Sequence, residues 1–148
     1  MNHAAALSKV SLFSNLGEKQ IRAIAQICTE RDFAPGTALM KQGEEGIGLF
    51  IILTGKVQIE KENSLGERFV IATNGPGDIM GEFAVLDGAK RTATVTALEP
   101  TKCLLLASWE FTSFMKAHPE VALAILPIVI KRFRETNDAL LSMSGVKV

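Results

Sequence analysis

Residues 80–95 combine a small-residue turn with one carboxylate, one guanidinium and a hydroxyl, which is a combination suited to binding a sugar phosphate. Arg91 offers a planar fork of donors that fits two phosphate oxygens at once. Gly81 and Ala84 are small, so the backbone N–H groups between them are open to an anion. Glu82 has the wrong sign for a phosphate but can accept from a ribose hydroxyl. A surface ion pair between Glu82 and Arg91, worth about 0 to 1 kcal/mol, is an equally simple interpretation.

A second stretch, residues 39–55, places Gly43 and Gly46 before a run of apolar residues that ends at Gly55. Together with the alternating residues 57–60, this pattern predicts strand, turn, buried strand, tight turn and strand. The two stretches closely resemble the cyclic nucleotide-binding domain, the module of the bacterial cAMP receptor family, of kinase regulatory subunits and of cyclic nucleotide-gated channels. The resemblance covers about residues 12–141.

The resemblance implies a role for each residue of the first stretch. Arg91 would pair with the cyclic phosphate, and Glu82 would accept from the ribose 2′-hydroxyl. The backbone N–H groups around Phe83, Ala84 and Thr92 would complete the anion site. In the family this segment includes a short helical turn, and the N-terminus of such a turn favours an anion. The implied set of phosphate and ribose contacts is Gly81, Glu82, Phe83, Ala84, Arg91, Thr92 and Ala93. The side chains of Phe83 and Val85 are expected in the core.

The family places its base contacts on the last helix, where this chain has Arg132, Thr136 and Asn137. The Thr136 hydroxyl and the Asn137 side chain can both accept from the exocyclic amine of adenine, so cAMP is expected as the preferred ligand. Thr92 argues for cGMP, because its hydroxyl can also meet the guanine amine. A solvent-exposed position for all three helix residues is the alternative.

Bulk properties predict one small domain over residues 1–148. Hydrophobic residues make up 47% of the chain, and 16 Lys and Arg balance 16 Asp and Glu. A formal charge of zero gives no electrostatic footprint for nucleic acid. The chain has no run of about 18 apolar residues and does not open with a secretory signal, so we expect no membrane span and a cytoplasmic location.

The pattern of elements is typical of a mainly β fold with flanking α-helices: a jelly-roll β-barrel (double-stranded β-helix) between an N-terminal helix and a C-terminal helix pair. Apolar residues at helical spacing after residue 18 predict the N-terminal helix. The β-roll spans about residues 30–107, with strands at 37–41, 49–53, 56–60, 68–73, 92–97 and 102–107. Ser108 is predicted to cap a helix through about 117, and Pro119 to begin a helix reaching about 141.

The last helix carries an apolar seam that indicates a homodimer. The seam consists of Ala122, Ile125, Leu126, Val129, Phe133 and Leu140, and Thr136 with Asn137 interrupts it. Pro127 predicts a kink that could serve as a hinge. Only residues 142–148 follow the helix, too few for a helix-turn-helix domain, so the signal is expected to pass to an unidentified downstream protein.

Three functions remain open at this stage. The first is a cyclic nucleotide-binding regulatory module with no catalysis, no cofactor and no metal. The second is a degenerate copy of the fold that serves as a protein-interaction scaffold. The third is a cupin-like enzyme, which needs clustered His and carboxylate ligands, whereas His3 and His118 lie outside the predicted strands. Cys28 and Cys103 sit among apolar neighbours and are expected to be inert buried thiols.

Overall fold

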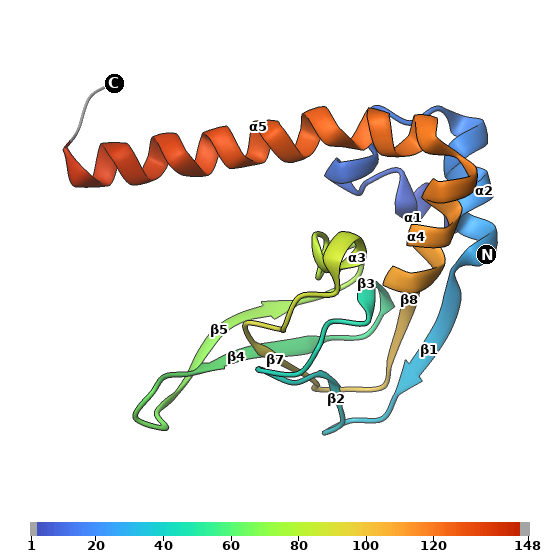
Figure 1. The fold of residues 1–148 in the computed structure, drawn as a ribbon. Helices are drawn as coiled ribbons and strands as arrows, with labels where there is room; N and C mark the ends of the chain where they lie inside the picture. Colours follow the sequence, from blue (N-terminus) through green and yellow to red (C-terminus); the bar gives the residue numbers. More distant parts are fainter. Residues whose placement is uncertain (1–2, 146–148) are drawn as a thin grey trace.

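The computed structural model describes residues 3–145 and arranges them as two antiparallel sheets with helices gathered at one end (Figure 1). The predicted domain limits, residues 1 and 148, lie outside the described residues. The strands are β1 (Thr29–Phe33), β2 (Ala38–Met40), β3 (Gly48–Thr54), β4 (Val57–Glu62), β5 (Arg68–Asn74), β6 (Ile79–Met80), β7 (Thr94–Ala97) and β8 (Thr101–Ala107). The helical elements are α1 (His3–Leu7), η1 (Ser11–Phe13), α2 (Glu18–Ile27), α3 (Ala84–Asp87), α4 (Ser108–Ala117) and α5 (Pro119–Ser144).

The strand order confirms the predicted jelly roll but not its closure. One sheet has the order β1-β8-β3-β6 and the other the order β2-β7-β4-β5, and every pairing is antiparallel. Among the described residues no strand belongs to both sheets, so the predicted jelly roll consists of two separate sheets that do not close into a barrel. The sheet edge at β6 is short, because that strand pairs only two residues with β3.

Two strands escaped the sequence analysis for different reasons. Strand β1 is mostly polar and exposed, so it lacks the apolar alternation that reveals a half-buried strand. Strand β6 has only two residues, too few for any period to be visible. The six predicted strands are confirmed, although β7 begins at Thr94 rather than at residue 92.

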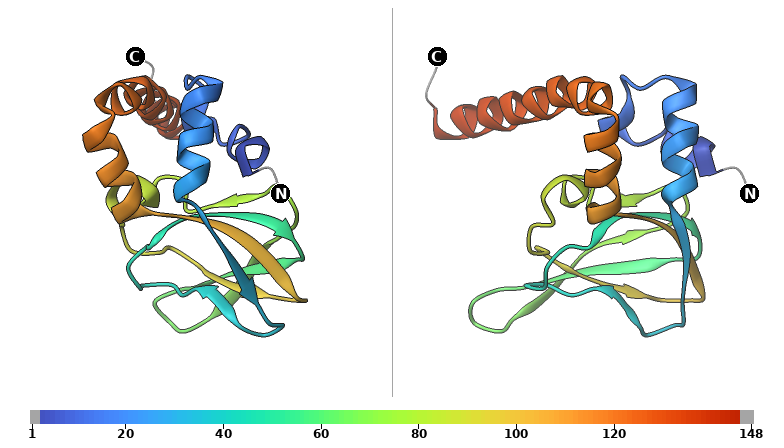
Figure 2. Two further views of the ribbon diagram at one scale, coloured as in Figure 1. Left: turned by 90° about the vertical axis from the view of Figure 1, so that its right-hand side faces the viewer. Right: turned by 45° about the vertical axis from the view of Figure 1, so that its right-hand side comes forward.

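Two apolar clusters explain why residues 49–53 form an unbroken hydrophobic run. Phe50 and Ile52 of β3 point into a cluster between the two sheets. Leu49 and Ile51 point the other way, into a cluster shared with the helices. Because neighbouring side chains on a strand face opposite sides, a strand buried on both faces must be apolar at every position. Figure 2 shows the helices that cover the second face.

The helices largely follow the predicted limits. Helix α2 forms the predicted N-terminal helix over about three turns, and the Gly17 N–H before it donates to Gln20 Oε1 at 3.0 Å. Helix α5 begins at Pro119 as predicted and ends three residues beyond the predicted limit. The capping role of Ser108 is wrong: Ala107 precedes the first helical turn, and the Ser108 N–H donates to the Ile47 carbonyl at 2.8 Å.

Helix α5 continues unbroken through Pro127, so the predicted hinge stays a prediction. It leaves α4 at an angle of 117° and carries its C-terminal half away from α2 and α4 (Figure 1). Of its predicted seam, Ile125 is buried, while Leu126, Phe133 and Leu140 are exposed. Within residues 3–145, no single helix has the length and apolarity of a membrane span. The bent pair α4 and α5 meets that test only on length and composition.

Candidate functional site

A cavity of about 460 Å³ lies beside α3, and it collects every residue predicted to contact the phosphate and the ribose. Its lining includes Gly81, Glu82, Phe83, Ala84, Arg91, Thr92 and Ala93. This volume falls within the range of small-molecule sites, which is about 300 to 1,000 Å³. The structure therefore brings the two halves of the 80–95 stretch together around one hollow.

An apolar wall completes the cavity, and the sequence analysis did not assign it to the site. It is formed by Met40, Ile59, Ile79, Met80 and Val95, which come from four different strands. The alternation of apolar residues along a strand predicts which side chains face inward. It does not predict which of these side chains border a cavity and which lie in the packed core. The wall offers apolar surface of the kind that a sugar or a base can pack against.

Arg91 is a buried cation at the edge of this cavity. Its side chain is 7% exposed, and no carboxylate of the described residues lies within ion-pair distance of it. The guanidinium donates to the Gly48 carbonyl, and its burial lowers the pKa of Arg91. A guanidinium keeps its proton in a protein, so the cost of burying this charge is not removed by deprotonation. The alternative of a surface ion pair between Glu82 and Arg91 is wrong.

The loop between β2 and β3, which contains Gly43 and Gly46, holds the backbone of Arg91 by two hydrogen bonds. The Arg91 N–H donates to the Glu44 carbonyl at 2.8 Å, and the Gly43 N–H donates to the Arg91 carbonyl at 2.9 Å. Gly81 has φ +72°, and a Cβ at that position would collide with the guanidinium. A glycine at residue 81 is therefore needed both for its left-handed backbone and for the space that Arg91 occupies.

Glu82 is bound to the N-terminal part of the chain rather than to Arg91. Its Oε1 accepts from Ser11 Oγ and from the Leu12 N–H, each at 2.7 Å. Its Oε2 lies 4.0 Å from the Arg132 guanidinium. Sequence reasoning missed the contact with η1, because about 70 residues separate the partners and no motif links them.

The turn at α3 presents backbone donors, though one fewer than predicted. The N–H groups of Phe83 and Thr92 have no acceptor among residues 3–145. The Ala84 N–H donates to the Gly81 carbonyl at 3.1 Å, so the expectation that it is open to an anion is wrong. A tight turn consumes that donor because the chain reverses within four residues.

Phe83 does not enter the core, and this prediction is also wrong. Its side chain is 39% exposed, and the Arg132 guanidinium lies 5.8 Å from the ring centroid. Phe83 immediately precedes α3, so the next inward position falls on Val85, which is fully buried as predicted. The aromatic ring therefore forms part of the rim of the cavity.

The three predicted base contacts do not line the cavity. Thr136 and Asn137 are exposed on the C-terminal half of α5. Arg132 lies nearer, because it donates to Ser11 Oγ and approaches Glu82. The described chain thus brings together the residues predicted to contact the phosphate and the ribose, and leaves the predicted base contacts apart from them.

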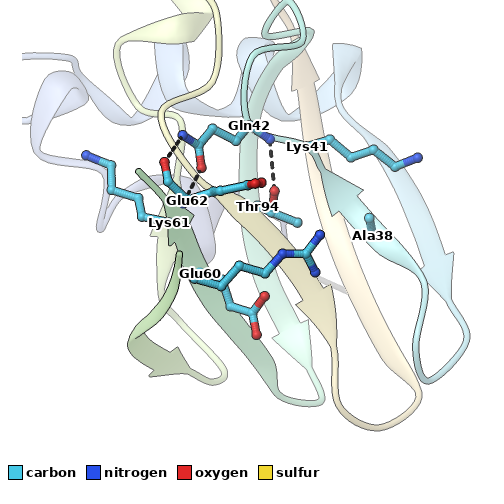
Figure 3. Close-up of a pocket in the computed structure, with 8 residues that line it drawn as sticks. Ala38, Lys41, Gln42, Glu60, Lys61, Glu62 and Thr94 are labelled. Atoms are coloured by element: carbon cyan, nitrogen blue, oxygen red, sulfur yellow. Dashed lines mark hydrogen bonds between the residues drawn. The ribbon is translucent and has the colours of Figure 1, made fainter. Parts of the chain in front are cut away.

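A second hollow lies on the opposite face of the β2-β7-β4-β5 sheet (Figure 3). Glu60 and Thr94 line it, whereas their chain neighbours Ile59 and Val95 line the Arg91 cavity, as strand alternation requires. At its border the Gln42 side chain bonds both backbone groups of Glu62, at 2.9 and 2.7 Å. Basic and acidic side chains mix in this hollow, so it has no single charge that would select a ligand.

A metal site would need clustered ligands, and a reactive thiol would need a lowered pKa. Among residues 3–145 no cluster of His, Cys, Asp or Glu could hold a metal ion. Burial raises the pKa of Cys28 and of Cys103 to about 12, with a smaller contribution at Cys28 from Glu110. Both thiols are thus protonated at neutral pH. Cys103 is buried as predicted, whereas Cys28 is only half-buried.

Comparisons with known proteins agree with this geometry. The family model described as cyclic nucleotide-binding domain matches residues 30–118. The chain is 27% identical over 134 residues to the CRP-like cAMP-activated global transcriptional regulator of Mycobacterium tuberculosis, across 90% of this chain and 60% of the regulator. It is 35% identical over 100 residues to the cAMP-dependent protein kinase regulatory subunit of Yarrowia lipolytica, across 68% of this chain and 26% of the subunit.

A solved structure extends the similarity to the whole arrangement. The N-terminal domain of a transcriptional regulator from Streptomyces coelicolor A3(2) aligns with a TM-score of 0.83 and 34% identity, covering 90% of this chain and 93% of that domain. The chain therefore spans nearly all of that N-terminal domain but only part of the length of the two curated relatives above.

Proposed function

The chain belongs to the cyclic nucleotide-binding domain family, and we propose that it is a regulatory module that binds cAMP in preference to cGMP in the cavity beside α3. Arg91 carries this proposal, because it is a buried cation without a counter-charge at the wall of a cavity large enough for a nucleotide. A cyclic phosphate would supply the missing negative charge to its two-pronged donor.

The remaining groups suit the other parts of the same ligand. The free N–H groups of Phe83 and Thr92 would donate to phosphate oxygens, and Glu82 would accept from the ribose 2′-hydroxyl. The two curated relatives are described as cAMP-activated and as cAMP-dependent, which supports the choice of cyclic nucleotide. Catalysis forms no part of this proposal.

The effect of ligand binding would be transmitted to a partner through α5. Arg132 of this helix lies beside both Glu82 and Phe83, so a change at the ribose end of the cavity would reach the helix directly. The exposed apolar residues farther along α5 would pair with a second copy of the chain and form a homodimer. The dimer would pass the signal to a downstream protein. A ligand can shift such an arrangement only if it contacts one arrangement better than the other.

A thermal-shift panel of cAMP, cGMP and linear AMP tests the proposal. A ligand at about one hundred times its Kd stabilises the native state by about 2.7 kcal/mol, which for a chain of this size raises Tm by roughly 5 to 10 °C. We expect this shift with cAMP, a smaller one with cGMP and none with AMP. A flat response to both cyclic nucleotides would leave the degenerate scaffold as the better description.

Hydrogen exchange tests the route of the signal separately. Saturating cAMP should change the exchange of amides within residues 119–141, with Pro127 itself silent because it has no N–H. If cAMP raises Tm while exchange in this helix stays the same, ligand binding stands and signalling through α5 does not.

A further inference from the structure

We propose that Ser11 is a positioning residue for the carboxylate that reads the ribose: it fixes one oxygen of Glu82 and leaves the other as the acceptor for the 2′-hydroxyl. This inference rests on the proposed function of the cavity. Ser11 lies in η1, outside the 30–118 region that the family model matches. The contact therefore joins Glu82, inside the matched region, to an N-terminal segment that the family model does not cover.

The direction of the hydrogen bonds at Ser11 follows from its neighbours. Its hydroxyl has one proton to donate and accepts through oxygen lone pairs. Arg132 is only a donor and points at Ser11 Oγ, so the Ser11 oxygen must accept there. The single Ser11 proton is then left for Glu82 Oε1, which lies at 2.7 Å. The hydrogen bonds therefore run in one direction, from Arg132 to Ser11 and from Ser11 to Glu82.

The two carboxylate oxygens of Glu82 differ in their hydrogen bonds. Oε1 receives two donors, the Ser11 hydroxyl and the Leu12 N–H, each at 2.7 Å. Oε2 has no hydrogen bond of its own among residues 3–145, and its nearest cation is the Arg132 guanidinium at 4.0 Å. Because a carboxylate held by two donors on one oxygen cannot rotate freely, the position of Oε2 is fixed before a ligand arrives.

The segment that holds Glu82 is itself anchored. Leu12 and Phe13 are both buried, and the Phe13 ring packs against Phe111 with centroids 5.5 Å apart. The Asn15 side chain donates to the Ala124 carbonyl of α5 at 3.2 Å. Ser11 therefore acts on Glu82 from a fixed support that also contacts the helix proposed to carry the signal.

The test compares the Kd for cAMP with the Kd for 2′-deoxy-cAMP by calorimetry. The ratio of the two constants reports the 2′-hydroxyl contact alone, whereas general damage to the fold or to the phosphate site weakens both ligands together. In Ser11→Ala the preference for cAMP should fall about three- to tenfold, as expected for a weakened hydrogen bond. Ser11→Cys, which keeps the size of the side chain but donates weakly, should reduce it in the same direction.

Two further variants serve as controls. Ser14→Ala removes an exposed hydroxyl from the end of the same segment and should keep the wild-type ratio. Ser11→Thr keeps a hydroxyl and should restore most of the preference. In a Glu82→Gln background, Ser11→Ala should change the ratio no further, because the two residues act on one contact.

Each outcome separates this inference from the proposed function. If the wild type binds both nucleotides and prefers cAMP, but the Ser11 variants leave the ratio unchanged or raise it, Ser11 does not position Glu82. If the wild type binds both equally, Glu82 does not read the ribose and the inference is overturned while phosphate binding stands. If the wild type binds neither, the proposed function fails and the inference fails with it.

Discussion

The part of the candidate site proposed to bind the phosphate and the part of α5 proposed to read the base differ in how many neighbours they have within one chain. Around Arg91, the loop between β2 and β3, the α3 turn and the apolar strands close on each other, and the key side chain is buried. Around Thr136 and Asn137, the helix is exposed and extends away from α2 and α4 (Figure 1). The first region is preorganised, whereas the second lacks neighbours within the described chain.

This difference indicates how such a module would divide binding from signalling. A preorganised anion site supplies affinity at little ordering cost, because its donors are already in place. A helix without neighbours is free to change its partner or its packing when a ligand arrives. The predictions below test whether the two regions are as separate in function as they are in structure.

The largest expected effect is at the phosphate end. Arg91→Ala should cost about 2 to 5 kcal/mol of cyclic nucleotide affinity, because it removes one partner of a desolvated charge pair. Arg91→Lys should not restore full affinity, since a point charge cannot reproduce the two-pronged donor. Calorimetry on folded protein measures both effects.

The matched control for this prediction is Arg68→Ala. Arg68 is an exposed arginine at the second hollow, on the opposite face of the sheet, and its removal should leave affinity unchanged. Equal losses in Arg91→Ala and Arg68→Ala would mean that general positive charge, rather than the cavity, binds the ligand.

The contrast between the regions also explains what the sequence could predict. Residues of the phosphate end lie within one short stretch whose types and spacing are set by local chemistry, so Arg91 and Gly81 could be assigned directly. Six strands were predicted from short apolar runs between turn residues, and the run at β3 is unbroken because that strand is buried on both faces. A local sequence pattern can predict these features because they depend on residues that are close in the sequence or on the burial of a whole strand.

What the sequence could not predict depends on contacts distant along the chain. Glu82 binds η1 across about 70 residues, and nothing near Ser11 indicates an acceptor. The apolar side chain of Phe83 was predicted to lie in the core, yet the turn into α3 directs it to the rim of the cavity. The closure of a barrel depends on hydrogen bonds between sheet edges, which no single strand pattern encodes.

The next effect tests whether the exposed half of α5 pairs with a second chain. Phe133→Ala should weaken a homodimer by about 1.5 to 3 kcal/mol, the value of burying one large apolar side chain. Phe133 is 70% exposed in the described chain, so the Tm of a monomer should barely change. Light scattering over a range of concentrations measures the dissociation.

Trp109→Ala is the matched control, because Trp109 is similarly exposed at 72% but lies on α4, away from the seam. It should leave the oligomeric state as in the wild type. A monomer at all concentrations in the wild type, with and without cAMP, would contradict pairing through α5.

A smaller effect is expected at the ribose. Glu82→Gln should weaken cAMP binding by about 1 kcal/mol, because a neutral acceptor replaces a charged one at the 2′-hydroxyl. Binding of 2′-deoxy-cAMP should be spared, since that ligand lacks the donor. An equal loss for both nucleotides in calorimetry would show that Glu82 supports the fold of the cavity rather than the ribose contact.

The most informative effect concerns the base, and it is expected to be no larger than the effect at the ribose. The double variant Thr136→Val/Asn137→Leu removes the acceptors proposed for the adenine amine and should reduce the preference for cAMP over cGMP by about 1 kcal/mol. Because both residues lie apart from the cavity in one chain, this loss should appear only where α5 packs against a ligand-bound protomer.

Competition binding of the two nucleotides to wild type, to this variant and to Thr92→Ala measures the preference. Thr92 borders the cavity directly, and its hydroxyl can rotate toward either a phosphate or a guanine amine, so its removal should matter less. If cGMP binds more tightly to the wild type and Thr92→Ala reverses that order, the base is read at the preorganised end, and the separation of the two regions does not extend to specificity.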